Sequence, residues 1–196
     1  MSALARALIA LAFTLAAGPA LAHPPAPGVG GFLGGLLHPL FVPAHALAVL
    51  ALGLLIGQQP AWGRAAPFAY IVALAVGLAV LTFGLVPMLM NELLLLLAIA
   101  CGALVALARP LPEAVGCALA AAVAFVLALD SPPEVVSVRE ANFLLIGTGF
   151  GATLLMIAVV EVASRLRGEW QRIGARVIGS WAAAAAILLL ALRFVR

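Results

Sequence analysis

Three histidines and one glutamate are the residues of this sequence best suited to binding a metal ion. His38 and His45 lie in the segment HPLFVPAH, Glu92 ends the segment VPMLMNE, and His23 begins the segment HPPAPGVGG. Imidazole and carboxylate groups are ligands of late first-row divalent metals, and imidazole suits nickel, copper and zinc. An ionisable side chain at the centre of a membrane helix costs on the order of 3 kcal/mol. If the surrounding segments span a membrane, these residues are therefore candidates for function.

The spacing of His38 and His45 decides whether the two imidazoles can share one ion. Seven residues along a regular helix would place both side chains on one face but about 10 Å apart, too far for metal–nitrogen bonds of about 2 Å. Pro39 and Pro43 interrupt that helix, and a re-entrant turn there would bring the rings together. Irregular backbone at membrane depth is tolerated mainly where it lines a cavity.

A structural role is the alternative for each of these residues. Each histidine could be a neutral residue at the membrane interface, hydrogen-bonded to a carbonyl group, while Glu92 reaches outward to water. If a leader is cleaved before His23, its α-amine and imidazole would form a chelate with two nitrogens, although Pro24 lacks the next amide N–H. The alternative for His23 is a solvated tail.

The composition shows which elements must position these side chains. Of 196 residues, 66% are hydrophobic and 9% are charged, and the mean hydropathy is +1.27. Helical apolar stretches of about 20 residues match the ~30 Å hydrocarbon core of a bilayer, where every backbone polar group must be satisfied internally. Runs such as LLLLLAIA lack the alternation of a transmembrane β-barrel strand. The sequence therefore predicts an all-α, polytopic integral membrane protein.

Other kinds of chemistry find no support in the sequence. It has no glycine-rich phosphate loop, HExxH, CxxC or nucleophile with a nearby base, so we predict no catalytic residue and no permanently bound cofactor. An intramembrane enzyme would need a paired acid and base, which is also missing. All ten basic residues are arginines, which indicates genomic base composition rather than nucleic-acid binding. Cys101 and Cys117 lie in apolar runs, where a cysteine usually packs as a small apolar residue.

The chain divides into a predicted signal peptide, residues 1–22, and a membrane domain, residues 23–196. An early arginine, an apolar stretch, a Gly-Pro break and the pattern Ala-Leu-Ala at 20–22 are typical of a secretory leader, which would make His23 the mature N-terminus. The alternative is an uncleaved extra helix. A bundle of six transmembrane helices fits the remainder: 41–57, 67–87, 91–108, 113–129, 142–163 and 174–194.

The charges of the connections predict the orientation of these spans. With the mature N-terminus outside, six arginines fall in cytoplasmic connections: Arg64, Arg109, Arg165, Arg167, Arg172 and Arg176. The external connections hold only Arg139, together with three acidic residues, Asp130, Glu134 and Glu140, and this asymmetry follows the positive-inside rule. The same topology predicts one external vestibule for a set of ligand-type residues: His23, His38, His45, Met88, Met90 and Glu92.

The stretch AHPPAPGVGGFLGGLLHPLFVPAHALAVLALGLL resembles the start of the HupE/UreJ family, the membrane accessory proteins of nickel hydrogenases and ureases. That family shows a signal peptide, AHP at the mature start, and a GLLHPLxGxDHxxAMxxxGL pattern in the first span. The segment PFAYIVALAVG, Glu92 and the Gly- and Ala-rich final span around Gly179 are similar too. The resemblance covers nearly the whole chain.

The resemblance implies a permease that brings nickel, or sometimes cobalt, across the bacterial inner membrane, with the mature N-terminus in the periplasm. It marks His38 and His45 as the first-span metal residues and Glu92 as the third-span acid. Three positions depart from the pattern: the Asp before the second His is Ala44 here, the Gly two residues before that Asp is Val42, and the Met four residues after that His is Val49. A further motif of the HGxAHG type is absent, because the fourth-span segment AAAVAFVLALDSPP contains no histidine.

Two hypotheses of different classes follow. The first is a permease-like protein for uptake of nickel, cobalt or a related divalent metal that supplies hydrogenase or urease maturation, with four metal-binding residues: His38, His45, Glu92 and His23. The second is a divergent relative that no longer transports metal and serves as a structural or accessory membrane protein. The predicted partners are the lipid bilayer and the divalent ion, without nucleic acid, and a homo-oligomer is left open.

Overall fold

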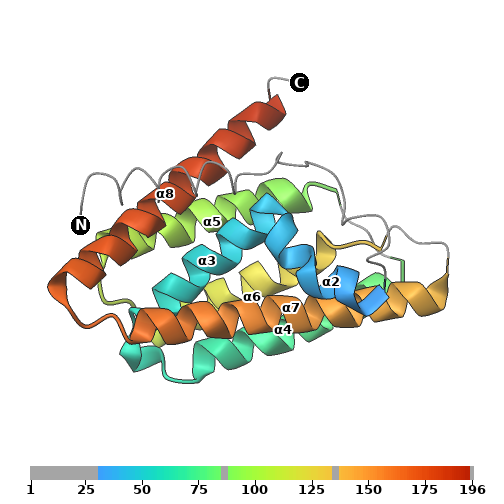
Figure 1. Ribbon diagram of the computed structural model, residues 1–196, viewed down its shortest axis with the longest axis horizontal. Helices are drawn as coiled ribbons and strands as arrows, with labels where there is room; N and C mark the ends of the chain where they lie inside the picture. The colour runs from blue at the N-terminus through green and yellow to red at the C-terminus, as the bar shows by residue number, and fades with distance from the viewer. Residues whose placement is uncertain (1–30, 85–87, 134–136, 195–196) are drawn as a thin grey trace, which may run out of the picture.

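The chain folds into a bundle of helices (Figure 1). The computed structural model describes residues 31–84, 88–133 and 137–194, so the predicted signal peptide and His23 lie outside the described residues. Seven α-helices and one short 3₁₀ helix make up this part of the chain: α2 (Gly31–Phe41), α3 (Pro43–Gly57), η1 (Pro60–Trp62), α4 (Ala65–Thr82), α5 (Met90–Leu107), α6 (Glu113–Leu129), α7 (Val138–Ser164) and α8 (Glu169–Phe194). No strand occurs within it, which confirms the all-α prediction.

The first hydrophobic segment is a broken helix rather than a single span over 41–57. Helix α2 begins at Gly31, ten residues before the predicted start, and α3 departs from its direction by 69°. The break lies at Val42, whose backbone is extended (φ −89°, ψ 111°), because a proline disfavours the helical region for the residue before it. Pro43 then occupies the first position of α3, where a missing N–H is tolerated. Pro39, expected to interrupt the helix as well, lies inside α2.

Helix α3 forms the centre of the bundle. It contacts α5, α6, α7 and α8, and ten of its 15 residues are buried. It lies between α5 and α7, which run roughly along the long axis of the molecule together with α4 and α6 (Figure 1). Because α3 is surrounded by other helices, any polar side chain that it carries is removed from lipid and must find its partners within the protein.

Glycines let α2 pack closely against α7. A Cβ atom added at Gly35 would overlap the carbonyl oxygen of Leu144, and one added at Gly147 would overlap the carbonyl oxygen of Phe32. Gly151 meets the Leu36 backbone in the same way. The spacing of Gly147 and Gly151 is the small-xxx-small pattern that allows close helix contact in membranes. This contact holds the short helix α2, and with it His38, against a 27-residue helix.

Four helices of the described chain are long and apolar enough to cross a membrane: α4, α5, α7 and α8. The bent pair of α2 and α3 makes a fifth candidate if it counts as one span. Helix α6 is apolar but has only 17 residues. Each predicted span therefore corresponds to a helix or a helix pair, and the last helix begins at Glu169 rather than near 174.

The directions of the helices define two ends of the bundle, and each end carries its own set of polar residues. We call one the histidine end, where α3 and α5 begin and α6 and α8 end, and the other the arginine end, where α4 and α8 begin and α5 ends. At the arginine end, two side chains of the α3–α4 connection donate hydrogen bonds to the backbone of the α5–α6 connection. Gln59 Nε2 donates a hydrogen bond of 2.7 Å to the Arg109 carbonyl oxygen, and Trp62 Nε1 donates one of 3.0 Å to that of Leu111.

Candidate metal centre

His38 and His45 meet at the break between α2 and α3. Their ring centroids are 5.1 Å apart and the rings are inclined by 73°, an edge-to-face arrangement. A continuous helix would have separated the side chains by about 10 Å, so the 69° bend at Val42 is what brings them together. The chain folds this way locally because Pro43 excludes the helical conformation from Val42.

Each of the two histidines has one buried ring nitrogen without a hydrogen-bond partner in the described part of the chain. These atoms are His38 Nε2 and His45 Nδ1. His45 is fully buried. A buried polar group left unsatisfied costs about 1–3 kcal/mol, and native proteins contain few of them. Two such nitrogens on adjacent imidazoles are the donor type that nickel and cobalt bind, so the pair fits a divalent cation chemically.

The other ring nitrogen of His45 contacts Asp130, just after the end of α6. The distance from His45 Nε2 to Asp130 Oδ2 is 3.0 Å, and the Asp130 side chain is 16% exposed. Asp130 joins the site from 85 positions further along the chain, and reasoning from the sequence placed it only among the acidic residues of an external connection. The signal that could have found it is its position: the end of the fourth predicted span lies on the same side as the start of the first.

Asn91 and Arg193 extend this contact across the histidine end. Asn91 Nδ2 donates a hydrogen bond of 3.1 Å to Asp130 Oδ2, and Arg193 Nη2 donates one of 2.8 Å to Asn91 Oδ1. The three residues come from the start of α5, the end of α6 and the end of α8. The result is a continuous polar chain from Arg193 through Asn91 and Asp130 to His45.

Glu92 lies at the same end of the bundle but binds a different partner. Its Oε1 atom is 3.6 Å from Arg193 Nη1, and its side chain is 24% exposed. The acid whose oxygen contacts a histidine is Asp130 rather than Glu92. Among the described residues, no group of three or more His, Cys, Asp or Glu side chains is arranged to hold a metal ion. The structure therefore brings together two of the predicted ligands, His38 and His45, and places Glu92 in an ion pair with Arg193.

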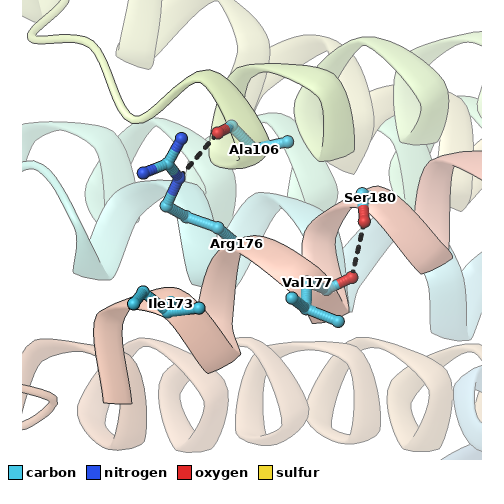
Figure 2. A pocket seen from close by; sticks show the side chains of 5 residues that line it. All are labelled: Ala106, Ile173, Arg176, Val177 and Ser180. Atoms are coloured by element: carbon cyan, nitrogen blue, oxygen red, sulfur yellow. Dashed lines mark hydrogen bonds between the residues drawn. The ribbon is translucent and has the colours of Figure 1, made fainter. Parts of the chain in front are cut away.

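A pocket at the arginine end has a different character. It encloses about 260 Å³ and is lined by Ala106, Ile173, Arg176, Val177 and Ser180. Figure 2 shows the Arg176 side chain directed at the end of α5, where its Nε atom donates a hydrogen bond of 2.8 Å to the Ala106 carbonyl oxygen. Helix C-termini carry unsatisfied carbonyls and partial negative charge, which a guanidinium stabilises. The pocket thus contains a cation that caps α5, which disfavours a metal ion there.

The bent segment with its two histidines contains the GLLHPL segment, residues 35–40, that was singled out in the sequence. The model of the HupE / UreJ protein family matches residues 11–189, nearly the whole chain. The chain belongs to the HupE/UreJ family. This membership confirms the resemblance found in the sequence. HupE/UreJ proteins are transporters or accessory proteins rather than enzymes, and they are generally linked to nickel or cobalt transport for hydrogenase or urease. Comparisons with curated proteins and with solved structures gave no match.

Proposed function

We propose that this HupE/UreJ protein is a permease that takes up Ni²⁺, or the chemically similar Co²⁺, and so supplies hydrogenase or urease maturation. One observation carries the proposal: two imidazoles from the halves of a broken helix lie 5.1 Å apart, and each has a buried nitrogen without a partner among the described residues. Imidazole nitrogen is a preferred donor for both cations. A broken helix at membrane depth is also typical of segments that line a transport path.

The same proposal includes a topology of six crossings in the bacterial inner membrane, with both mature termini in the periplasm. Helix α6, with 17 residues, is about 26 Å long, slightly less than the ~30 Å hydrocarbon core. A short span is accommodated by local thinning of the bilayer at modest cost. The six arginines of the arginine end then face the cytoplasm, in keeping with the positive-inside rule. The histidine end faces the periplasm, where the metal ion arrives.

The charges of the histidine end favour a cation. Asp130 lies beside the histidine pair, and Glu92 adds a second carboxylate nearby, partly offset by Arg193. The ion loses part of its water shell when it binds, and the two imidazole nitrogens replace part of it. Because His45 is buried and α3 is the central helix, an ion held there has already left the aqueous face of the protein.

Uptake of radiolabelled nickel by cells that express the protein tests the proposal. We expect His38→Ala and His45→Ala to abolish uptake above a vector control while the protein still inserts into the membrane. Ser131→Ala is the matched control, because Ser131 is buried next to Asp130 but its hydroxyl bonds only the Leu127 carbonyl of the preceding helix α6, at 2.8 Å. Equal uptake by the wild type and both histidine variants would contradict the proposal.

A second candidate function is a structural or accessory membrane protein that does not transport. The observation that favours it is that the described residues contain no ready-made set of three ligands. Nickel uptake and the activity of the nickel enzyme distinguish the two functions. An accessory protein would leave nickel uptake at the vector level for the wild type as well, while its deletion would still lower the activity of the hydrogenase or urease of the same cell.

A further inference from the structure

The polar chain at the histidine end has a fixed direction of hydrogen-bond donation. A guanidinium only donates, so the Asn91 atom that Arg193 contacts must be the amide oxygen. That leaves the Asn91 NH₂ group facing Asp130, and Asp130 Oδ2 must accept from it. The orientation of the Asn91 amide is therefore set from both sides.

The contact between Asp130 and His45 also has a defined donor and acceptor. Asp130 Oδ2 already accepts from Asn91, and an ionised carboxylate has no proton to give. The 3.0 Å contact between His45 Nε2 and Asp130 Oδ2 is therefore a hydrogen bond in which Nε2–H is the donor. In a neutral imidazole only one nitrogen carries a proton, so the lone pair of His45 resides on Nδ1. Nδ1 is the buried ring nitrogen that has no partner within the described chain.

We infer that Asp130 is the positioning residue of the metal site: by accepting from His45 Nε2–H, it fixes Nδ1 as the nitrogen that ligates the ion. The inference rests on the proposed function. Metal-ligating histidines commonly donate their other ring N–H to a carboxylate, which fixes the tautomer and the ring orientation. Asn91 and Arg193 act one step further out, since they hold the Asp130 carboxylate in place.

Asp130 supplies the carboxylate that is missing from the position directly before His45. The family pattern has an Asp directly before the second histidine, and the chain has Ala44 there. Ala44 is 3% exposed and has no group that could accept a hydrogen bond from a ring nitrogen. The carboxylate that contacts His45 comes instead from the end of α6, so the chain retains a carboxylate–imidazole pair without the local motif.

Nickel uptake as a function of nickel concentration tests the role of Asp130. Asp130→Leu removes the acceptor but keeps the branched shape of the side chain, and we expect the nickel concentration for half-maximal uptake to rise by about 10–100-fold. Asp130→Asn keeps an acceptor oxygen but loses the charge, and we expect a smaller rise. If Asp130→Leu does not insert, Asp130→Asn supplies the measurement. Ser131→Ala, at the next position, should leave the value unchanged.

A spectroscopic readout separates positioning from a merely structural role. In long-range ¹H–¹⁵N spectra of the full chain labelled in its histidine rings, His45 should carry its proton on Nε2, with its signals identified by their loss in His45→Ala. In Asp130→Leu we expect these signals to shift toward the tautomer that is protonated on Nδ1. An unchanged His45 spectrum, or an unchanged half-maximal concentration with less inserted protein, would overturn the inference.

The uptake measurements distinguish the role of Asp130 from that of the histidines. If the histidine variants abolish uptake but Asp130→Leu takes up nickel like the wild type, the positioning role is wrong and the proposed function stands. If the histidine variants take up nickel like the wild type, the proposed function is wrong, and the ¹H–¹⁵N spectra still show whether Asp130 fixes the His45 tautomer.

Discussion

Arg193 in the last turns of α8 donates a hydrogen bond of 2.8 Å to Asn91 Oδ1 at the start of α5, 102 positions earlier. This contact joins the C-terminal helix to the polar chain that ends at His45. The Arg193 side chain is 54% exposed, so its hydrogen bond contributes less than a buried one would. Its role is to orient Asn91 and, through it, Asp130.

We therefore expect Arg193→Gln to raise the nickel concentration for half-maximal uptake only a few-fold, less than Asp130→Leu. The matched control is Arg165→Gln, which removes an arginine that pairs with Glu161 on the exposed surface of the arginine end. Uptake curves for both variants check the prediction. An effect of Arg165→Gln equal to that of Arg193→Gln would point to general membrane electrostatics instead.

Substitution of Glu92 tests whether Glu92 or Asp130 is the acid that acts at the metal site. Its carboxylate lies 3.6 Å from Arg193, and the acid that contacts His45 is Asp130. We predict that Glu92→Gln lowers nickel uptake less than about fivefold, since a partly exposed ion pair contributes about 0–1 kcal/mol. A loss of uptake as complete as that of His45→Ala would show that Glu92 is a metal ligand.

The contact between α2 and α7 predicts a sharp difference between two glycines. In Gly147→Ala the added methyl group would overlap the Phe32 carbonyl oxygen, so α2 must shift, and we expect a loss of about 1–3 kcal/mol in stability. Uptake should fall as well, because α2 carries His38. In Gly174→Ala the methyl group meets no atom within 4 Å among the described residues, and a helical glycine replaced by alanine gains up to about 1 kcal/mol. Thermal unfolding in detergent compares the two variants, and equal melting temperatures would contradict the described packing.

Uptake should depend on external pH because protons and metal ions compete for imidazole nitrogen. Lower pH favours protonation of the lone pair that binds the ion, so nickel uptake should decrease as the external pH falls. The titratable groups that contact His45 are the His38 ring and the Asp130 carboxylate. Uptake that increases steadily over the same fall in pH would contradict a site made of imidazoles.

The helices and the meeting of the two histidines could be predicted from the sequence because both depend on local chemistry. Long apolar runs must be helical in lipid, and Pro43 excludes the helical conformation from Val42, so a bend between His38 and His45 follows from neighbouring residues. Pro39 shows the limit of this reasoning. It lies within α2 without ending the helix.

Asp130, Asn91 and Arg193 could not be assigned to the site in this way. Each lies at the end of a different helix, and their contacts depend on how α5, α6 and α8 pack around α3. The sequence predicts that all of these helix ends lie on one side of the membrane, but it does not predict which side chains meet. For Glu92 and Asp130, both acidic and both at the histidine end, only the packing selects Asp130 as the partner of His45.

His38 and His45 are proposed to bind one divalent cation together, and X-ray absorption at the nickel edge observes such a shared site directly. The full-length protein, purified in detergent and loaded with one equivalent of Ni²⁺, should show the multiple scattering of two imidazole ligands. His38→Ala and His45→Ala should each reduce this to one imidazole or lose the metal. A wild-type spectrum with only oxygen ligands, or one that neither substitution changes, would contradict the account.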